Sequence, residues 1–244
     1  MTRILVINPN TSRAMTGTVG RCAREVAAPG TEVRAAGPSM GPESIESHYD
    51  AALSVPGLLI EVAQGEADGV DGYVIACFGD PGLDAARELA RGPVVGIAEA
   101  AMHTASLLGR TFSIVTTLSR TIGRTRDLVH RYGFTDACAG VHASDIPVLD
   151  LEAPEPRRHV LEACATALEN DRSDVLVLGC AGMADLCGDI SARLGVPVVD
   201  GVTAATKLVE SLIALGLRTG KRDEYAPPGP KRYTGLLRDF TIPP

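Results

Sequence analysis

The chain of 244 residues contains no Trp, and aromatic residues make up only 4% of it. Proteins that bind single-stranded nucleic acid usually stack the bases on aromatic side chains, and membrane proteins place Trp and Tyr at the bilayer surface. Basic residues are also few, 23 against 30 acidic ones, and they form no cluster that could bind a polyanion. We therefore expect no nucleic-acid partner, no membrane partner, and a small ligand site without aromatic stacking.

Long hydrophobic runs are absent too. No stretch approaches the ~20 apolar residues of a membrane helix. The chain opens with Thr2, Arg3 and a short apolar run, without the features of a signal peptide, so we expect a cytoplasmic protein. Thiols are seldom bridged in that reducing compartment. The six cysteines, at positions 22, 77, 138, 164, 180 and 187, are therefore available for chemistry or for packing.

What the sequence does contain is a series of short β-rich runs, each followed by a segment that suits a helix. The runs lie at residues 4–7, 33–36, 72–76, 94–97, 112–115, 175–178 and 196–199. Strands that alternate with helices form parallel sheets with crossover helices, and continuously apolar runs indicate strands covered on both faces. The fold class is predicted to be α/β. Ligands of such sheets bind beyond the carboxyl ends of the strands.

Three strand ends of the first half recur in the second half in the same order. Residues 4–8 match 112–116, residues 73–77 match 176–180, and residues 93–96 match 197–200. Such a repeat indicates two similar units. We predict two pseudosymmetric parallel-sheet lobes with the active site between them. Lobe 1 would comprise residues 1–97 with about 203–244, and lobe 2 residues 98–202.

Two polar segments interrupt the pattern. Residues 39–56 form a longer link, which is either a plain surface loop or a lid in which His48 closes over a ligand. Pro227, Pro228 and Pro230 exclude regular structure near the end of the chain. This tail is predicted to be a strap or an oligomer contact.

Cys77 and Cys180 stand at equivalent strand ends of the two halves. If the halves face each other, the two thiols project into one cleft from opposite walls. Inversion of a carbon acid needs this arrangement, because one base removes a proton from one face and a second group returns a proton to the other. A thiol pKa of ~8.5 falls near a helix N-terminus, where both cysteines are expected, and a coupled pair works as one thiolate and one thiol. Backbone donors around Gly79 and Gly182 could receive an enolate oxygen. The alternative is that both cysteines are small core residues.

Other chemistry has little support in the sequence. The remaining four cysteines lack equivalent partners and are expected to pack, and no ligand spacing indicates a metal. No phosphate-binding glycine loop follows the first strand, so no nucleotide cofactor is expected. At the first strand end Asn8, Asn10 and Thr11, and at its counterpart Thr116 and Thr117, offer amides and hydroxyls that either contact a substrate or cap helices.

The chain resembles the hydantoin racemases of the aspartate/glutamate racemase superfamily, a group that includes allantoin racemases. The resemblance spans the chain and rests on residues 4–11 (ILVINPNT), 44–46 (SIE), 56–59 (PGLL), 76–82 (ACFGDPG) and 179–183 (GCAGM). It implies two flavodoxin-like halves, a homo-oligomer, and a cofactor-independent racemase of 5-substituted hydantoins in which Cys77 and Cys180 exchange the C5 proton. The expected substrate-binding residues are Asn8, Asn10, Thr11, Ile45, Phe78, Gly79, Thr116, Thr117, Ala181 and Gly182.

Departures from the superfamily's glutamate racemases bear on the substrate. Those enzymes carry Asp-Ser-Gly after the first strand and Cys-Thr-His around the second cysteine, where this chain has residues 8–10 (NPN) and 180–182 (CAG). The groups that assist deprotonation of an amino acid are missing, so a neutral cyclic amide or ureide with an acidic C–H is expected. Allantoin is the alternative to other hydantoins. A maleate isomerase, an arylmalonate decarboxylase and a non-catalytic binding protein are more distant alternatives.

Overall fold

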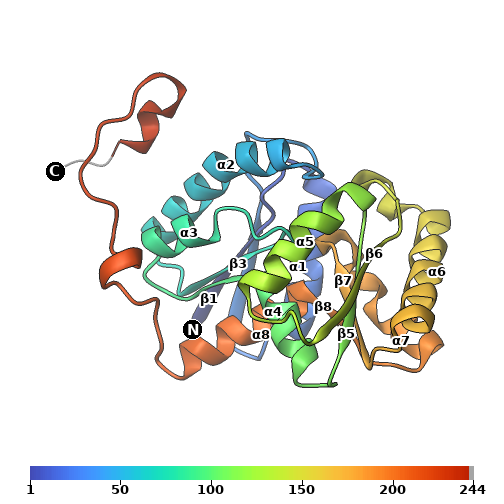
Figure 1. The fold of residues 1–244 in the computed structure, drawn as a ribbon. Helices are drawn as coiled ribbons and strands as arrows, with labels where there is room; N and C mark the ends of the chain where they lie inside the picture. Colours follow the sequence, from blue (N-terminus) through green and yellow to red (C-terminus); the bar gives the residue numbers. More distant parts are fainter. Residues whose placement is uncertain (242–244) are drawn as a thin grey trace.

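The computed structural model describes residues 1–241, and within this range it contains two four-stranded parallel sheets with helices on their faces (Figure 1). The first sheet has the order β2-β1-β3-β4, from β1 (Thr2–Ile7), β2 (Thr31–Ala36), β3 (Gly72–Ile75) and β4 (Val94–Gly96). The second has the order β6-β5-β7-β8, from β5 (Phe112–Thr116), β6 (Cys138–Ala143), β7 (Val175–Gly179) and β8 (Val198–Asp200). Because the two orders are equivalent, the predicted α/β fold with two similar halves is confirmed.

Helices connect the strands in both halves. The α-helices assigned within the described range are α1 (Arg13–Val26), α2 (His48–Ala67), α3 (Leu83–Leu89), α4 (Ile97–Ser106), α5 (Ile122–Arg131), α6 (Pro154–Asp171), α7 (Cys187–Leu194) and α8 (Gly201–Ala214). Short 3-10 helices are η1 (Ser119–Thr121), η2 (Val148–Glu152), η3 (Ala181–Leu186), η4 (Asp223–Tyr225) and η5 (Gly235–Phe240). The hydroxyls of Ser12 and Ser47 accept backbone N–H groups at the starts of α1 and α2.

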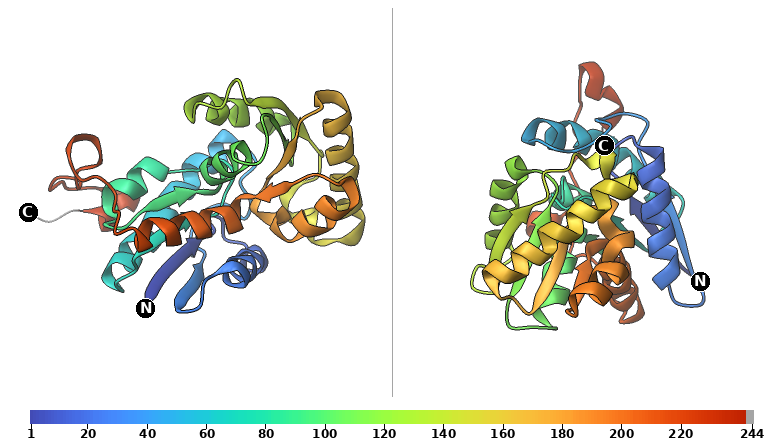
Figure 2. Two further views of the ribbon diagram at one scale, coloured as in Figure 1. Left: turned by 90° about the horizontal axis from the view of Figure 1, so that it is seen from below. Right: turned by 90° about the vertical axis from the view of Figure 1, so that its right-hand side faces the viewer.

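Two helices cross from one sheet to the other. α4 follows β4 but packs on β7 and β8, whereas α8 follows β8 but packs on β1, β3 and β4. At their crossing a β-carbon on Gly201 would lie 2.2 Å from the Ile97 carbonyl oxygen, so glycine is required there. Figure 2 shows α8 running along the first half. On this packing we propose lobe 1 as residues 1–97 with 203–241, and lobe 2 as 98–202; the remainder of the expected lobe 1, residues 242–244, lies outside the described residues.

Some local predictions are wrong. Residues 39–56 are not one link, because α2 begins at His48 and contains Pro56. Pro56 removes a hydrogen bond to the carbonyl of Ala52, but Ala52 is on the exposed face of α2, where water can bind that carbonyl. Strand β6 was not predicted because only Val141 of its six residues is buried. Ile97, expected at the end of a strand, begins α4.

Among the residues that the structure describes, no helix has both the length and the apolar character that a membrane crossing requires.

Candidate active site

A cavity of about 40 Å³ lies where the carboxyl ends of strands from both sheets meet. The residues that line it come from both lobes: Asn10, Met15, Ile45, Ala76, Cys77, Phe78, Gly79, Thr116, Thr117, Thr121, Arg124, Thr125, Val148, Gly179, Cys180 and Ala181.

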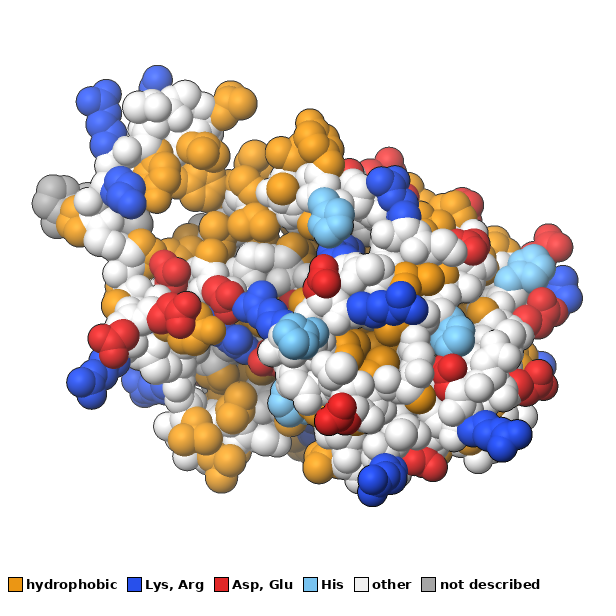
Figure 3. All heavy atoms as spheres, in the orientation of Figure 1, with side chains coloured by type: hydrophobic (Ala, Val, Ile, Leu, Met, Phe, Trp, Pro, Cys, Tyr) orange, Lys and Arg blue, Asp and Glu red, His pale blue; other side chains and the backbone are white. Residues whose placement is uncertain are grey.

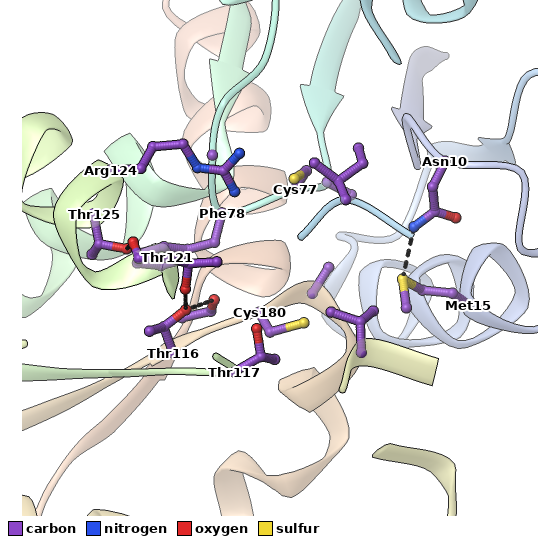
Figure 4. Close-up of a pocket in the computed structure, with 16 residues that line it drawn as sticks. Asn10, Met15, Cys77, Phe78, Thr116, Thr117, Thr121, Arg124, Thr125 and Cys180 are labelled. Atoms are coloured by element: carbon purple, nitrogen blue, oxygen red, sulfur yellow. Dashed lines mark hydrogen bonds between the residues drawn. The ribbon is translucent and has the colours of Figure 1, made fainter. Parts of the chain in front are cut away.

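Cys77 and Cys180 both line this cavity, one from each lobe (Figure 4). Cys77 comes two residues after β3 and Cys180 comes directly after β7. The strands before them are completely buried, whereas the two cysteines are partly exposed. The structure therefore brings together the two thiols that the internal repeat singled out.

The surroundings of the two thiols differ from the predicted ones. Cys180 directly precedes η3, but Cys77 precedes a turn in which the Asp80 N–H donates to the Cys77 carbonyl, and α3 begins only at Leu83. Burial raises the pKa of the Cys77 thiol, although the Arg124 guanidinium acts in the opposite direction. Burial likewise raises the pKa of Cys180 to about 12. The expected lowering of both pKa values is thus wrong, because the loss of hydration outweighs the local donors.

Backbone N–H groups near the cysteines act on the two sulfurs. The Gly79 N–H lowers the pKa of Cys77, and the Gly182 N–H lowers the pKa of Cys180, so each favours the thiolate. These are the groups expected to receive an enolate oxygen. In this structure they offer partial compensation for the cost of charging a largely desolvated thiol.

Arg124 is the charged cavity residue that the sequence analysis missed. It lies on α5 and directs its guanidinium toward Cys77 (Figure 4). Gly79 permits this approach, since a β-carbon there would lie 2.9 Å from the guanidinium carbon. Nη1 of Arg124 also donates a hydrogen bond to the Ser47 carbonyl oxygen at 3.4 Å, and this bond links α5 to the start of α2. In the sequence nothing distinguishes Arg124 from its exposed neighbour Arg126.

Hydroxyl groups from the second lobe form a polar side of the cavity. The hydroxyl oxygens of Thr116 and Thr121 are 3.0 Å apart, and the Thr125 hydroxyl donates to the Thr121 carbonyl. Within residues 1–241 the Thr117 hydroxyl has no hydrogen-bond partner, so it is available to a ligand. Thr121 ends η1, and Arg124 and Thr125 lie one turn further on, in α5. They were not predicted because they lie beyond the strand ends and reach the cavity only through tertiary packing.

Most of the predicted substrate-binding residues line the cavity. Seven do so: Asn10, Ile45, Phe78, Gly79, Thr116, Thr117 and Ala181. Three do not. The Asn8 amide is buried and donates to Asn10 Oδ1 at 2.7 Å, which shapes the loop rather than the cavity. The Thr11 N–H donates to the Pro42 carbonyl, and Gly182 lies beside the Cys180 sulfur without reaching the cavity wall.

Two loops, one from each lobe, cover the cavity. Ile45 precedes α2, Val148 begins η2, and both side chains line the cavity. The Val148 N–H donates to Glu46 Oε1 at 2.7 Å, so one hydrogen bond joins the two loops. His48 is exposed and does not line the cavity, because it already belongs to α2. The prediction that His48 closes over a ligand is wrong.

The other four cysteines lie away from the cavity. Cys22 and Cys164 are buried in the core, Cys138 donates to the Gly140 carbonyl, and Cys187 donates to the Val198 carbonyl. Nowhere in the described part of the chain do three or more His, Cys, Asp or Glu side chains gather in a way that could hold a metal ion.

Known proteins resemble this chain in sequence and in fold. The family model for Asp/Glu/Hydantoin racemase matches residues 4–209. The chain belongs to this family. As a family member it is 47% identical to a hydantoin racemase of Rhizobium meliloti, over 95% of this chain and 97% of that protein. It is 45% identical to a hydantoin racemase of Pseudomonas sp. (strain NS671), over 98% of this chain and 96% of that protein.

The sequence of this chain is more similar still to that of a protein of known structure. The allantoin racemase from Klebsiella pneumoniae is 54% identical to it, covers 99% of both chains, and superposes with a TM-score of 0.96. These similarities confirm the predicted family and support a racemase activity, ahead of the isomerase, decarboxylase and binding-protein alternatives.

Proposed function

We propose that the protein racemises a 5-substituted hydantoin by exchanging the C5 proton between Cys77 and Cys180, without a cofactor and in the cytoplasm. The observation that carries this proposal is the pair of thiols that line one cavity from equivalent strand ends of two lobes. A thiolate on one side removes the C5 proton, and the thiol on the other side donates a proton to the opposite face of the enolate. Each turnover then leaves the negative charge on the other sulfur.

The charges around the two sulfurs favour one resting state. Arg124 lowers and Asp80 raises the pKa of Cys77, in both cases through the charge of the side chain. The charges of Cys77 and of the Glu46 carboxylate both raise the pKa of Cys180 further. The first proton of the coupled pair is therefore expected to leave Cys77. In the resting enzyme Cys77 is the base and Cys180 is the acid.

The chemistry of the cavity wall favours a small, polar 5-substituent. Four threonines, Asn10 and Arg124 form the polar part of the cavity wall, and Met15, Ile45, Phe78 and Val148 form its apolar part. Allantoin is a hydantoin with a ureido group at C5, and that group can exchange hydrogen bonds with hydroxyl and amide side chains. An aromatic substituent would leave the Thr117 hydroxyl without a partner. The 54% identity to the Klebsiella pneumoniae allantoin racemase also supports allantoin as the substrate.

The test is racemisation in deuterated water. Each pure enantiomer of allantoin and of a 5-alkylhydantoin is incubated with the protein, and optical rotation and the C5 proton signal are followed against an enzyme-free control. We expect rotation and proton signal to decay faster than in the control, with allantoin preferred. A faster reaction of the alkylhydantoin would overturn the choice of allantoin but not the racemase proposal.

Cysteine variants test the two-base chemistry. Removing a general acid or base costs about 10²–10⁴-fold in rate, so Cys77→Ser and Cys180→Ser should each reduce racemisation by at least about 100-fold. Cys187→Ser is the matched control, because Cys187 lies outside the cavity and serine can still donate to the Val198 carbonyl. Racemisation at the parent rate in either cavity variant would refute the mechanism. Each variant keeps one base, so we expect proton exchange of a single enantiomer to survive without inversion.

A further inference from the structure

Residues 77–80, here called the Cys77 turn, end at an aspartate with an unusual backbone. The φ of Asp80 is +41°, in the left-handed region that residues other than glycine seldom adopt. Asp80 is also buried, with 5% of its surface exposed. Such a conformation costs free energy, persists only where the surrounding structure holds it, and is frequent at active sites. Contacts with other segments must therefore hold the Cys77 turn in place.

The carboxylate of Asp80 accepts three hydrogen bonds. Its Oδ1 accepts the Ala98 N–H at 3.1 Å, and its Oδ2 accepts the Glu99 N–H at 3.0 Å and the Tyr132 hydroxyl at 2.7 Å. The first N–H groups of a helix have no partner within it, and Gly96, which precedes α4, has no side chain to bind them. Asp80 therefore caps α4. Burial raises the pKa of this carboxyl to about 6 although the three bonds act in the opposite direction, so it is ionised above that pH.

All three donors lie in the proposed lobe 2, whereas Asp80 lies with Cys77 in the proposed lobe 1. Two of them begin α4, the helix that crosses to the second sheet, and Tyr132 directly follows α5. The Tyr132 ring also packs against a hydrophobic cluster of lobe 1. The Asp80 N–H in turn donates to the Cys77 carbonyl at 2.9 Å. A continuous chain of hydrogen bonds therefore joins the end of α5 to the residue that carries the first thiol.

Another polar contact between the lobes lies close to this turn but at the surface. Arg131 is paired with Asp84 of α3, and the two side chains are 49% and 46% exposed. Solvent screens exposed pairs, which contribute little to holding a structure. Figure 3 shows acidic and basic side chains dispersed over the visible face of both lobes. Asp80 is shielded from solvent, so its hydrogen bond with Tyr132 is the contact that we expect to fix the Cys77 turn to lobe 2.

We propose that Asp80 and Tyr132 are positioning residues that hold Cys77 opposite Cys180, an inference that rests on the proposed racemase function. Racemisation needs the two sulfurs at opposite faces of one carbon, and the sulfurs come from different lobes. Their spacing therefore depends on how the Cys77 turn is fixed to lobe 2. Neither Asp80 nor Tyr132 lines the cavity, so the pair acts through Cys77 and not on the substrate. A reacting group misplaced by about 1 Å can cost about 100-fold in rate.

Tyr132→Phe tests the pair, because it removes the hydroxyl and keeps the packed ring. We expect kcat for racemisation to fall about 10- to 100-fold while KM changes less than about twofold. Burial raises the pKa of Tyr132 and keeps its hydroxyl neutral, so its loss should leave the acidic limb of the pH profile in place. Tyr225→Phe is the matched control: it removes a hydroxyl that donates to Asp84 at 3.1 Å, within lobe 1, and should keep the parent kcat.

Asp80→Asn separates positioning from charge. Asparagine tolerates a left-handed backbone and keeps the shape of the side chain, but it offers one acceptor oxygen in place of two. We expect kcat to fall about tenfold or more. The acidic limb should move to lower pH at the same time, because the Asp80 charge raises the pKa of Cys77. The other charged group facing Asp80 is Glu99, which stays paired with Arg87 at 2.6 Å. A role through charge alone would move the limb without lowering kcat.

The outcomes distinguish this inference from the proposed function. The parent kcat in Tyr132→Phe would refute the positioning role, as would an equal loss in Tyr225→Phe. A parent that racemises neither allantoin nor the alkylhydantoin would refute the proposed function instead. Hydrogen exchange then tests the pair without a substrate: the amides of residues 77–80 should exchange faster in Tyr132→Phe than in the parent, and equal exchange would refute the pair. Circular dichroism verifies that each variant is folded, and Asp80→Asn decides if Tyr132→Phe is not.

Discussion

The positive charge of Arg124, next to Cys77, should control the pH dependence of the reaction. Arg124 lies in the cavity wall with Cys77 and abuts Gly79, two residues further along the chain. An opposite charge within about 4–6 Å lowers the pKa of an acid by about 1–3 units. Arg124→Gln removes that charge and should therefore raise the pKa of Cys77. Because the thiolate is the reacting form, the acidic limb of kcat/KM should move up by about 1–3 pH units.

The size of the effect on kcat/KM depends on the pH at which the assay is made. On the acidic limb each unit of pKa lowers kcat/KM about tenfold, so the variant should lose about 10- to 1000-fold there and recover as the pH rises through its new pKa. A role of Arg124 in substrate binding alone would reduce kcat/KM at every pH. The full pH profile therefore separates the two roles.

The assay is polarimetry with each enantiomer across the pH range. The enantiomers have equal free energy, so kcat/KM must be the same in both directions for every variant, and both profiles should shift together. Arg124→Lys keeps the charge and should keep the limb close to its parent position. Arg126→Gln removes an exposed charge of the same helix, outside the cavity, and serves as the control. An acidic limb that stays in place in Arg124→Gln would refute the assigned role.

Two further predictions concern packing and loop closure. In Gly96→Ala the new β-carbon would lie 2.2 Å from the Asp80 carboxyl carbon, so we expect a loss of about 1–3 kcal/mol and a Tm lower by about 2–4 °C per kcal/mol. Gly123→Ala, at a helical position with open space around it, should instead keep or raise Tm; equal effects of the two would contradict the steric argument. Glu46→Ala removes the acceptor of the Val148 N–H and should raise KM several-fold, whereas Glu46→Gln keeps an acceptor and should change KM little. Unchanged KM in Glu46→Ala would show that this hydrogen bond does not hold the loops over the cavity.

The internal repeat was readable from the sequence because of how parallel sheets are built. The central strands β3, β5 and β7 are covered on both faces, so they appear as unbroken apolar runs, and the residues after them fall at one sheet edge. Cys77 and Cys180 could therefore be paired before any coordinates were known. Edge strand β6 lacks such a run, since Val141 is its one buried residue, and it was missed for that reason.

The tertiary structure alone decided the rest of the cavity. Arg124 belongs to α5 and reaches Cys77 only because the two lobes pack against each other and Gly79 leaves room. Spacing along the sequence carries no information about such a contact. The pKa values of the thiols were likewise beyond the sequence, because the burial that raises them is a property of the assembled cavity.

The sequence by itself determined the α/β class, the two similar halves, the family and the cysteine pair. Each of these depends on short apolar runs and motifs and on their repetition along the chain. Only the tertiary structure decided which polar side chains meet the two sulfurs and which loops cover them. The physical reason is that these features depend on contacts between residues far apart in the chain, and such contacts exist only after the lobes have packed.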